Sequence, residues 1–260
     1  MDHKQVGRLW DQNADAWTEL SRQGYDTYRD WLNTPAFMDI LPDIQGKLGL
    51  DIGCGEGHNT RQVAERGACI IAVDIAKRFV IHSKAVEGEQ TGKLTYAIAS
   101  AVELPFDGEK FDFITAFMSL MDIPETEQVI MEAYRELKPG GFLQFSITHP
   151  CFDTPHRVNL RDDHGITYAI EVGDYFRNQD GKITEWLFSA APDEAKSGLQ
   201  PFRTPRFTRT ISQWFNLLID TGFKIERVSE PRPSDDTVNQ CPNIQDAQVV
   251  AYFLHIRVRK

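Results

Sequence analysis

The sequence predicts an α/β fold: a doubly wound, Rossmann-like sheet with helices on both faces. An apolar run at residues 48–52 stops at three alternating glycines, and a helical pattern follows it directly. A second β-rich run, 68–73, ends in Asp74 one crossover helix further along the chain. A continuous apolar stretch at 111–117 is typical of a strand that is buried on both faces. Strands that alternate with helices in this way indicate a mostly parallel sheet.

The first expected element is an amphipathic helix at residues 3–20, whose apolar side chains recur at three- and four-residue steps. One interpretation is a helix that packs on the domain through Trp10 and Trp17, and the other is a lid over a ligand site. Thr34 and Pro35 have the residue types of an N-cap and a first helical position. They predict a short helix that ends before Pro42.

The turn after the first strand has the glycine spacing of a ligand-binding loop. Gly53, Gly55 and Gly57 allow a ligand to lie against bare backbone, and the N–H groups at the helix start face its polar groups. The dinucleotide fingerprint G-x-G-x-x-G is not matched, because the third glycine comes one residue early and a histidine follows it. Asp51, just before the turn, would repel a pyrophosphate and attract a cationic ligand.

Polar and small residues follow the next two strands at the same edge of the sheet. A carboxylate at the end of the second strand, Asp74, suits the two hydroxyls of a ribose. Its alternative role is a helix N-cap for residues 76–86. The third strand is expected at 94–98, and Ser100 and Ala101 come directly after it. The Asp74 carboxylate supports an adenosine ligand without choosing which one.

The fourth strand, 111–117, leads into a loop that starts at Met118, where open α/β sheets bind ligands. A helix is expected at 126–137, a Lys-Pro-Gly-Gly turn ends it, and the fifth strand is expected at 142–148. His149 follows this strand. It either faces the cleft, where its ordinary pKa makes it a usable general base, or hydrogen-bonds its own loop.

Residues 153–206 depart from a minimal Rossmann pattern. Strands are expected at 166–172 and 182–188, joined by a hairpin turn around 178–181. This aromatic-rich insertion would cover the site and select the substrate, with a dimer contact or a solvated flap as alternatives. The chain closes with a helix at 210–220, a strand at 223–228, a long polar loop at 230–246 and a final strand at 248–259.

Taken together, these motifs resemble class I S-adenosylmethionine-dependent methyltransferases of type 11, the ubiquinone/menaquinone-biosynthesis-like family. The resemblance rests on the Asp-x-Gly-x-Gly-x-Gly motif at 51–57, on Asp74, on the Ala-Ser-Ala-Val-Glu-Leu-Pro-Phe segment at 99–106 and on the Leu-Lys-Pro-Gly-Gly run before the fifth strand. Where the family has an acidic residue for the adenine amino group, this chain has Ser100. The resemblance implies a seven-stranded sheet whose last strand is antiparallel. It also implies a single domain, with a helical lid at 1–42, a cofactor core at 43–150, a substrate cap inserted after the fifth strand at 151–206 and closing elements at 207–260.

The implied activity is methyl transfer from S-adenosyl-L-methionine to a small-molecule acceptor by in-line displacement, with S-adenosyl-L-homocysteine as the product. The protein then mainly supplies alignment and desolvation. His149 is the candidate base if the acceptor is a hydroxyl or an amine. The implied cofactor-binding residues are Asp51, Gly53, Cys54, Gly55, Gly57, Asp74, Ile75, Ser100, Ala101, Met118 and Trp17. The implied substrate-binding residues are His149, Phe152, Tyr168 and Tyr175.

Two other classes of function stay open. One is an NAD-type oxidoreductase, against which stand the histidine in place of the fingerprint glycine and the lack of a second substrate domain. The other is a non-catalytic module that binds S-adenosylmethionine. An RNA methyltransferase would need a local basic groove that the overall charge does not indicate.

Composition limits the partners. The 260 residues carry a formal net charge of -10, which argues against a broad nucleic-acid surface. No apolar run approaches the roughly 20 residues that span a membrane. The four cysteines are scattered without metal-ligand spacing, which predicts reduced thiols, a cytoplasmic location and no metal site. The expected partners are a small-molecule acceptor and a second copy in a homodimer.

Overall fold

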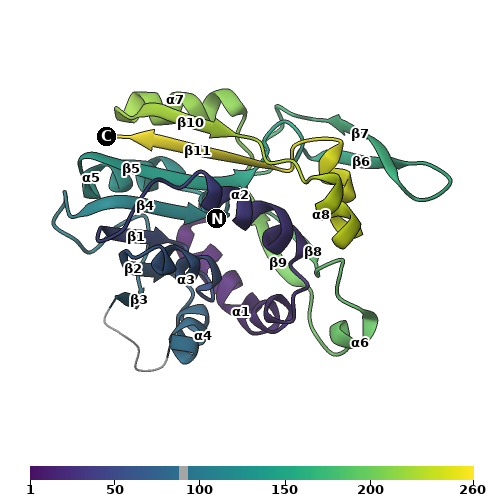
Figure 1. Cartoon of the computed structure of the whole chain (residues 1–260), viewed down its shortest axis with the longest axis horizontal. Coiled ribbons are helices and arrows are strands. Elements are labelled where there is room, and N and C mark those ends of the chain that lie inside the picture. The colour runs from purple at the N-terminus through teal and green to yellow at the C-terminus, as the bar shows by residue number, and fades with distance from the viewer. Residues whose placement is uncertain (88–92) are drawn as a thin grey trace.

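A seven-stranded sheet forms the centre of the computed structural model, which describes residues 1–87 and 93–260 (Figure 1). The strand order is β10-β11-β5-β4-β1-β2-β3. β1 pairs in parallel with β2 and β4, β2 with β3 and β4 with β5, whereas β11 is antiparallel to both β5 and β10. The predicted Rossmann-like sheet with an antiparallel last strand is confirmed. Its strands are β1 (Leu48–Ile52), β2 (Cys69–Asp74), β3 (Leu94–Ile98), β4 (Phe111–Phe117), β5 (Leu137–Thr148), β10 (Lys224–Ser229) and β11 (Phe253–Arg259).

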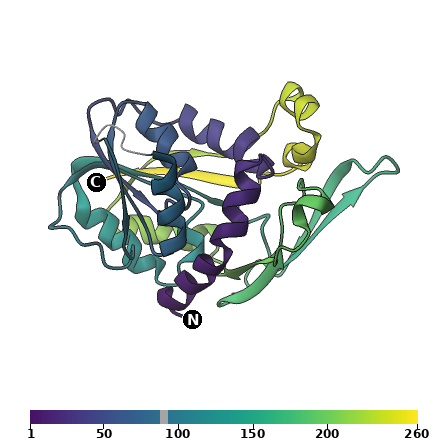
Figure 2. The ribbon, with the colours of Figure 1, turned by 90° about the horizontal axis from the view of Figure 1, so that it is seen from below.

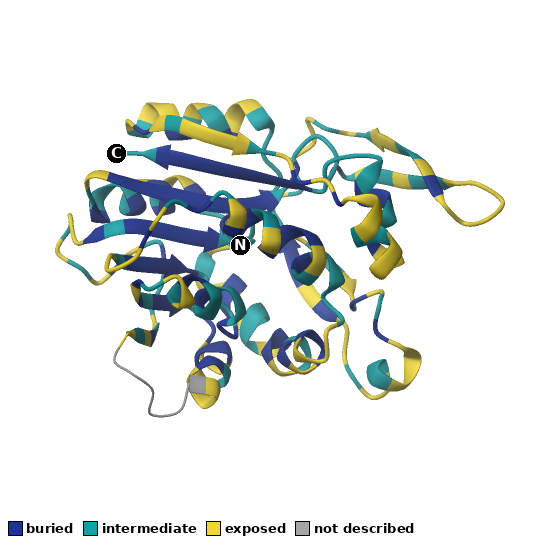
Figure 3. Cartoon of the chain, viewed as in Figure 1, coloured by how far each residue is buried: buried dark blue, intermediate teal, exposed yellow. Residues whose placement is uncertain are grey.

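Helices cover both faces of this sheet. Side chains alternate along a strand, so Phe145 of β5 faces one layer and Phe142 faces the other. The first layer buries Ile130 and Trp214 against Phe145, and the second buries Phe37 together with Phe142. The central strands are accordingly buried along most of their length (Figure 3). The first layer is made by α5 (Thr126–Glu136) and α7 (Ile211–Thr221), and the second by α2 (Thr34–Asp39), α3 (His58–Glu65) and α4 (Lys77–Glu87).

The amphipathic helix expected near the N-terminus is α1 (His3–Arg22), and it packs against α4 and β9 (Phe202–Arg206) (Figures 1 and 2). It starts in a capping box, in which the Asp2 side chain accepts the Gln5 backbone N–H and the Gln5 side chain accepts the Asp2 N–H. Within residues 1–87 and 93–260, no helix combines the length and the apolar character needed to cross a membrane.

The two strands predicted in the insertion are present, but the prediction that they pair with each other in one hairpin is wrong. The structure has two separate hairpins, β6 (His156–Arg161) with β7 (Thr167–Gly173), and β8 (Lys182–Trp186) with β9. A tight turn decides the first pairing: the Asp162 carboxylate accepts the N–H groups of His164 and Ile166 at 2.9 Å. That turn folds β7 back onto β6 before the 178–181 segment is reached. The β6–β7 hairpin extends away from the sheet and is largely exposed (Figures 2 and 3).

Other segments also differ from the prediction. The Lys-Pro-Gly-Gly run is not a separate turn, because β5 already begins at Leu137 and passes through it with Gly140 at φ 78°. The polar loop at 230–246 contains α8 (Asp235–Gln240) and runs into the 3₁₀ helix η3 (Pro242–Gln248), so β11 starts at Phe253. A π-helical turn, η1 (Arg29–Asn33), precedes α2. A further short helix, α6 (Asp193–Lys196), lies between β8 and β9, and the 3₁₀ helix η2 (Leu120–Asp122) follows β4.

Candidate functional site

A cavity of about 500 Å³, the main cavity, opens at the carboxyl ends of β1, β2 and β4. Its wall includes residues from the glycine turn, from the segment after β3 and from the turn after β4. Side chains of α1, η1 and the β8–β9 hairpin close it on the other side. Sequence segments that are far apart therefore meet at the edge of the sheet where the ligand site was predicted.

The glycine turn has the backbone conformation that the sequence predicts. Gly53, Gly55 and Gly57 have φ values of 69°, 54° and 87°, a region that side-chain-bearing residues rarely adopt. A Cβ on Gly53 would lie 2.4 Å from the Cβ of Ser119, whereas a Cβ on Gly55 would meet nothing within 4 Å. Gly53, Cys54 and Gly55 line the main cavity. The turn therefore presents bare backbone beside open space.

Two residues of the predicted motif lie behind this wall and do not line the main cavity. The Asp51 carboxylate is buried, and it accepts the hydroxyls of Thr60 at 2.6 Å and Thr115 at 2.8 Å. Burial raises the pKa of Asp51 to about 6, against the two hydroxyl hydrogen bonds. Gly57 is the N-cap of α3, where a Cβ would lie 2.4 Å from the hydroxyl oxygen of Tyr96. Both residues shape the turn from behind.

Asp74, at the end of β2, lines the main cavity. Its Oδ2 accepts the N–H of Gly55 and its Oδ1 that of Ala76, each at 2.8 Å. A carboxylate with one hydrogen bond on each oxygen keeps acceptor capacity for two more donors. Burial raises the pKa of Asp74 to about 6, although the Ala76 and Gly55 N–H groups favour the charged form. Ile75 lies beside it in the cavity wall.

The neighbouring strands supply the rest of the predicted wall. Ser100 and Ala101 line the cavity after β3, and the Ser100 hydroxyl accepts the N–H of Val102 at 3.2 Å. Met118, at φ 52°, lines it after β4. Next to Met118, the Ser119 hydroxyl donates to the carbonyl of Ile52 at 2.7 Å and ties this turn to the end of β1.

The N-terminal helix closes the cavity with an aromatic cluster. Trp17, which lines the cavity, lies 4.9 Å from Phe188 and 4.8 Å from Phe202 between ring centroids. Trp186 contacts the same three rings. α1 and the β8–β9 hairpin are therefore held together at the cavity by interlocking rings.

Four predicted substrate-binding residues do not line the main cavity. His149 is buried, and its Nδ1 accepts the Cys151 N–H at 3.2 Å. Its Nε2 consequently carries the proton and donates it to Glu230 Oε1 at 2.7 Å. The expectation that His149 faces the cleft is corrected: the chain turns at this residue and the ring is fixed from outside the cavity. Phe152 packs on that ring at 4.8 Å between centroids.

The two tyrosines also lie elsewhere. Tyr168, on β7, is 63% exposed. Tyr175 borders a small pocket next to the main cavity, and the two share Asp122 and Arg206 in their walls; the Tyr175 hydroxyl accepts the N–H of Ile211 at 2.8 Å. Their placement follows from the two-hairpin arrangement, which directs β7 away from the sheet edge.

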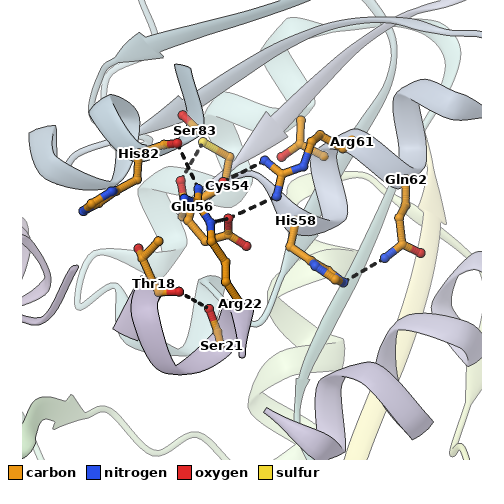
Figure 4. Close-up of polar contacts among 12 residues, drawn as sticks. Thr18, Ser21, Arg22, Cys54, Glu56, His58, Arg61, Gln62, His82 and Ser83 are labelled. Carbon is orange, nitrogen blue, oxygen red and sulfur yellow. Dashed lines mark hydrogen bonds and ion pairs between the residues drawn. The ribbon is translucent and has the colours of Figure 1, made fainter. Parts of the chain in front are cut away.

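The sequence analysis missed a buried ion cluster next to the glycine turn (Figure 4). The Glu56 carboxylate is 4% exposed and accepts Arg22 at 3.1 Å and Arg61 at 3.0 Å. Arg29 approaches its other oxygen at 3.9 Å. Arg22 also donates to the carbonyl of His82 in α4, so this cluster joins α1 to the turn and to α4. Glu56 directly follows Gly55, and that adjacency is the only sequence signal for it.

Other residues of the cavity wall were missed, among them Asn33 and Asn59; Asp122 lies in the loop that the sequence places at this edge, but it was not singled out. The Oδ1 of Asn33 accepts the Ser146 hydroxyl, and that of Asn59 accepts the Thr34 hydroxyl. No local pattern marks the two asparagines, because their partners lie on other elements.

Comparison with known proteins decides the family. The family model for a type 11 methyltransferase domain matches residues 50–145. The ubiquinone biosynthesis O-methyltransferase of Coxiella burnetii is 31% identical over 158 residues, which cover 55% of this chain and 67% of that protein.

The chain belongs to the class I S-adenosylmethionine-dependent methyltransferases of type 11.

Solved structures share the fold of this methyltransferase. An S-adenosylmethionine-dependent methyltransferase from Mesorhizobium loti superposes with a TM-score of 0.70 at 24% identity, covering 87% of this chain and 96% of that one. The phosphoethanolamine N-methyltransferase 2 of Haemonchus contortus, solved in complex with S-adenosyl-L-methionine, gives a TM-score of 0.56 at 18% identity and covers 87% and 52%. The enzyme transfers a methyl group from S-adenosylmethionine, and the comparisons give the oxidoreductase and the non-catalytic module no support.

The residues of this methyltransferase fit that cofactor. The space beside Gly55 is open, and the Asp74 carboxylate keeps free acceptor sites at the same edge. The aromatic wall at Trp17 is suited to an adenosine, whose base and ribose have large flat and apolar surfaces.

Proposed function

We propose that S-adenosylmethionine binds in the main cavity and that the methyl acceptor is a small molecule held in the same cavity. The observation that carries this proposal is the pairing of the glycine turn with the Asp74 carboxylate, both of which line the cavity and are joined by a 2.8 Å hydrogen bond. The cofactor, when bound, supplies a methyl group on a positively charged sulfur that a nucleophile displaces in line. Gly53, Cys54 and Gly55 hold the methionine portion.

The remaining wall residues take the adenosine. Asp74 accepts the ribose hydroxyls beside Ile75, and Ser100 and Ala101 border the adenine. Met118 lies at the methionine portion, and Trp17 covers the bound cofactor from the lid. Asp51 and Gly57 act indirectly, because Asp51 anchors Thr60 and Thr115 and Gly57 starts α3.

The enclosed shape supports a small acceptor. α1 and the β8–β9 hairpin close the cavity over the sheet edge, and a macromolecular acceptor would have to displace their interlocked rings. We assign residues 1–42 to a lid, 43–150 to the cofactor core, 151–206 to the cap and 207–260 to the closing elements of one domain. Within the cap, only the β8–β9 half reaches the cavity wall.

Calorimetric titration with S-adenosylmethionine, S-adenosylhomocysteine and NAD in parallel tests this function. Micromolar binding of the two sulfur compounds and none of NAD is the expected result. Binding of NAD alone, or of none of the three, would overturn the proposal.

We also propose a cytoplasmic location and a homodimer. The four thiols of the chain form no disulfide, which suits a reducing compartment. The β6–β7 hairpin and the segment after it expose apolar side chains, among them Tyr168 at 63% and Phe176 at 87%, which a second copy could cover. Light scattering at micromolar concentration tests the dimer, and a monomer mass would exclude it there.

A further inference from the structure

The turn after β4 places an acidic residue, Asp122, in the wall between the main cavity and the small pocket beside Tyr175. Asp122 is the last residue of η2 and lines the cavity wall together with Met121 and Ile123. Its backbone N–H donates to the carbonyl of Ser119 at 3.1 Å. Ser119 in turn packs against Gly53, where an added Cβ would come within 2.4 Å of the Ser119 Cβ. Asp122 thus lies one 3₁₀ turn, a rise of about 6 Å, beyond Ser119, the residue that packs against the glycine turn.

Asp122 differs from the other carboxylates that line the cavity. Asp74 accepts two backbone N–H groups, Glu56 accepts two arginines, and Asp26 accepts the N–H of Arg29 at 3.4 Å. In the part of the chain that the structure describes, no donor hydrogen-bonds to the carboxylate of Asp122. Its lone pairs are therefore available to a molecule in the cavity.

Asp122 has an apolar neighbour on each side in the chain, Met121 and Ile123, and one ion pair acts on its charge. Met121, Ile123 and Trp186 line the same cavity. Arg206 of β9 pairs with Asp153, the residue pair whose charges act on Asp122. Burial raises the pKa of Asp122 to about 7, while Arg206 lowers it and Asp153 raises it further. A carboxylate with such a pKa takes up a proton readily near neutral pH.

We infer that Asp122 is the proton acceptor of the methyl transfer and that the methyl acceptor is an apolar, ring-containing molecule with an ionisable O–H or N–H group. This inference rests on the proposed function, because it needs the cofactor at the glycine turn. The acceptor oxygen or nitrogen forms a bond to the methyl carbon as the carbon–sulfur bond breaks, and that electron pair stays on sulfur. The proton of the acceptor passes to the Asp122 carboxylate. The products are the methylated acceptor, S-adenosylhomocysteine and the carboxylic acid form of Asp122.

The predicted base, His149, cannot take this part from its observed position. It does not line the main cavity, and both of its ring nitrogens have partners on the outside, the Cys151 N–H and Glu230. His58 does line the cavity, but its Nε2 contacts the Gln62 side chain at 2.8 Å. Burial lowers the pKa of His58.

The test compares two methyl acceptors, one that needs a general base to lose its proton and one that does not. Purified protein is incubated with methyl-tritiated S-adenosylmethionine and either catechol, whose hydroxyls are protonated near neutral pH, or 4-nitrocatechol, whose more acidic hydroxyl ionises without a base. Asp122→Asn keeps the shape and removes the base. Asp122→Glu restores a carboxylate, and Asp107→Asn, an exposed residue, is the matched control. Calorimetry with S-adenosylhomocysteine checks that each variant is folded and binds.

We expect Asp122→Asn to lower kcat for catechol by about 10²-fold or more, the usual contribution of a general base, and to change the rate for 4-nitrocatechol little. The residual rate on catechol should rise with pH as the acceptor ionises, and Asp122→Glu should recover part of the loss. Equal losses on both acceptors, or no loss on either, would overturn the role of Asp122. Transfer to neither phenol by a wild type that binds the cofactor would overturn the acceptor class. Absence of cofactor binding would count against the proposed function instead.

Discussion

The Asp74 carboxylate accepts the backbone N–H of Gly55 at 2.8 Å, and this hydrogen bond joins the end of β2 to the glycine turn after β1. The other oxygen of Asp74 accepts the N–H of Ala76 at the same distance. The carboxylate is therefore fixed in the cavity wall before any ligand arrives, so a ligand that uses it needs little reorganisation of the protein.

Replacing Asp74 should weaken cofactor binding. Asp74→Ala removes the acceptor that we assign to the ribose hydroxyls, and we expect a loss of about 1–3 kcal/mol in binding free energy, as for a hydrogen bond to a charged group. Calorimetric titration with S-adenosylhomocysteine measures it, with the exposed Asp39→Asn as control. An unchanged Kd in Asp74→Ala would remove this residue from the site.

Cofactor affinity should also depend on pH through Asp74. Burial raises its pKa to about 6 in the free protein, and hydroxyl donors favour the charged form, so binding lowers that pKa and releases a proton. The cofactor should therefore bind with full affinity well above pH 6, and this affinity should fall as the pH drops through 6. One unit below the pKa, the Kd should be about tenfold higher.

The Asp74→Asn variant separates this effect from the other buried carboxylates. It cannot titrate at this position, so its Kd, although higher, should change much less between pH 7 and pH 5. A pH dependence equal to that of the wild type would assign the proton to another group, of which Asp51, with its pKa also raised to about 6 by burial, is the first to examine.

The parts of the site that could be predicted are those that local sequence specifies. Gly53, Gly55 and Asp74 are marked by their positions at strand ends, because a parallel sheet brings the carboxyl ends of its strands to one edge. The same rule places the backbone of His149 at that edge, but it does not fix the direction of the imidazole ring. The direction of the ring depends on Glu230, which comes from another part of the chain.

Asp122 and Glu56 illustrate the opposite case. A single acidic residue in a loop has no periodicity, and its partners or their absence follow only from tertiary structure. The strand pairing in the insertion was predicted wrongly for a related reason. The Asp162 turn and the 178–181 segment both have turn chemistry, and only the folded chain shows that the first one sets the pairing.

Two neighbouring glycines should respond differently to a methyl group. In Gly53→Ala the new Cβ meets Ser119 at 2.4 Å in a left-handed backbone, and we expect a loss of about 1–3 kcal/mol in the free energy of unfolding. In Gly55→Ala the new Cβ meets no other part of the protein within 4 Å. The free energy of unfolding should therefore fall by only about 1 kcal/mol, the cost of a left-handed backbone for a residue with a side chain.

Cofactor binding should respond strongly to a methyl group at Gly55. The open space at Gly55 is where we place the cofactor, so Gly55→Ala should raise the Kd for S-adenosylhomocysteine in a protein that is still folded. Denaturant unfolding and calorimetry on both variants check this. Normal affinity in Gly55→Ala would mean that the ligand does not approach the turn.

The aromatic cluster should hold the lid closed. Phe202 is fully buried against Trp17 and Phe188, and Phe202→Ala should cost about 3–5 kcal/mol in local stability. Amide hydrogen exchange should become faster in 182–206 and in the first half of α1, while the sheet stays protected. Ile219→Ala, at a residue of α7 that is 54% exposed, should leave exchange in 182–206 and α1 unchanged. Faster exchange throughout the chain would instead indicate global destabilisation.

Neutralising Glu56 should weaken the ion cluster that joins α1 to the glycine turn and to α4. Glu56→Gln leaves three guanidinium groups around an amide, which is costly for buried groups. Because Arg22 is 37% exposed and solvent screens it, we expect a loss of about 2 kcal/mol, less than for a wholly buried pair. Thermal unfolding measures this loss, and the exposed Glu65→Gln is the control.

Adding Arg22→Ala to Glu56→Gln should cost less than the two single changes combined, because the residues share one interaction. Additive losses would show that Arg22 and Glu56 stabilise the protein independently.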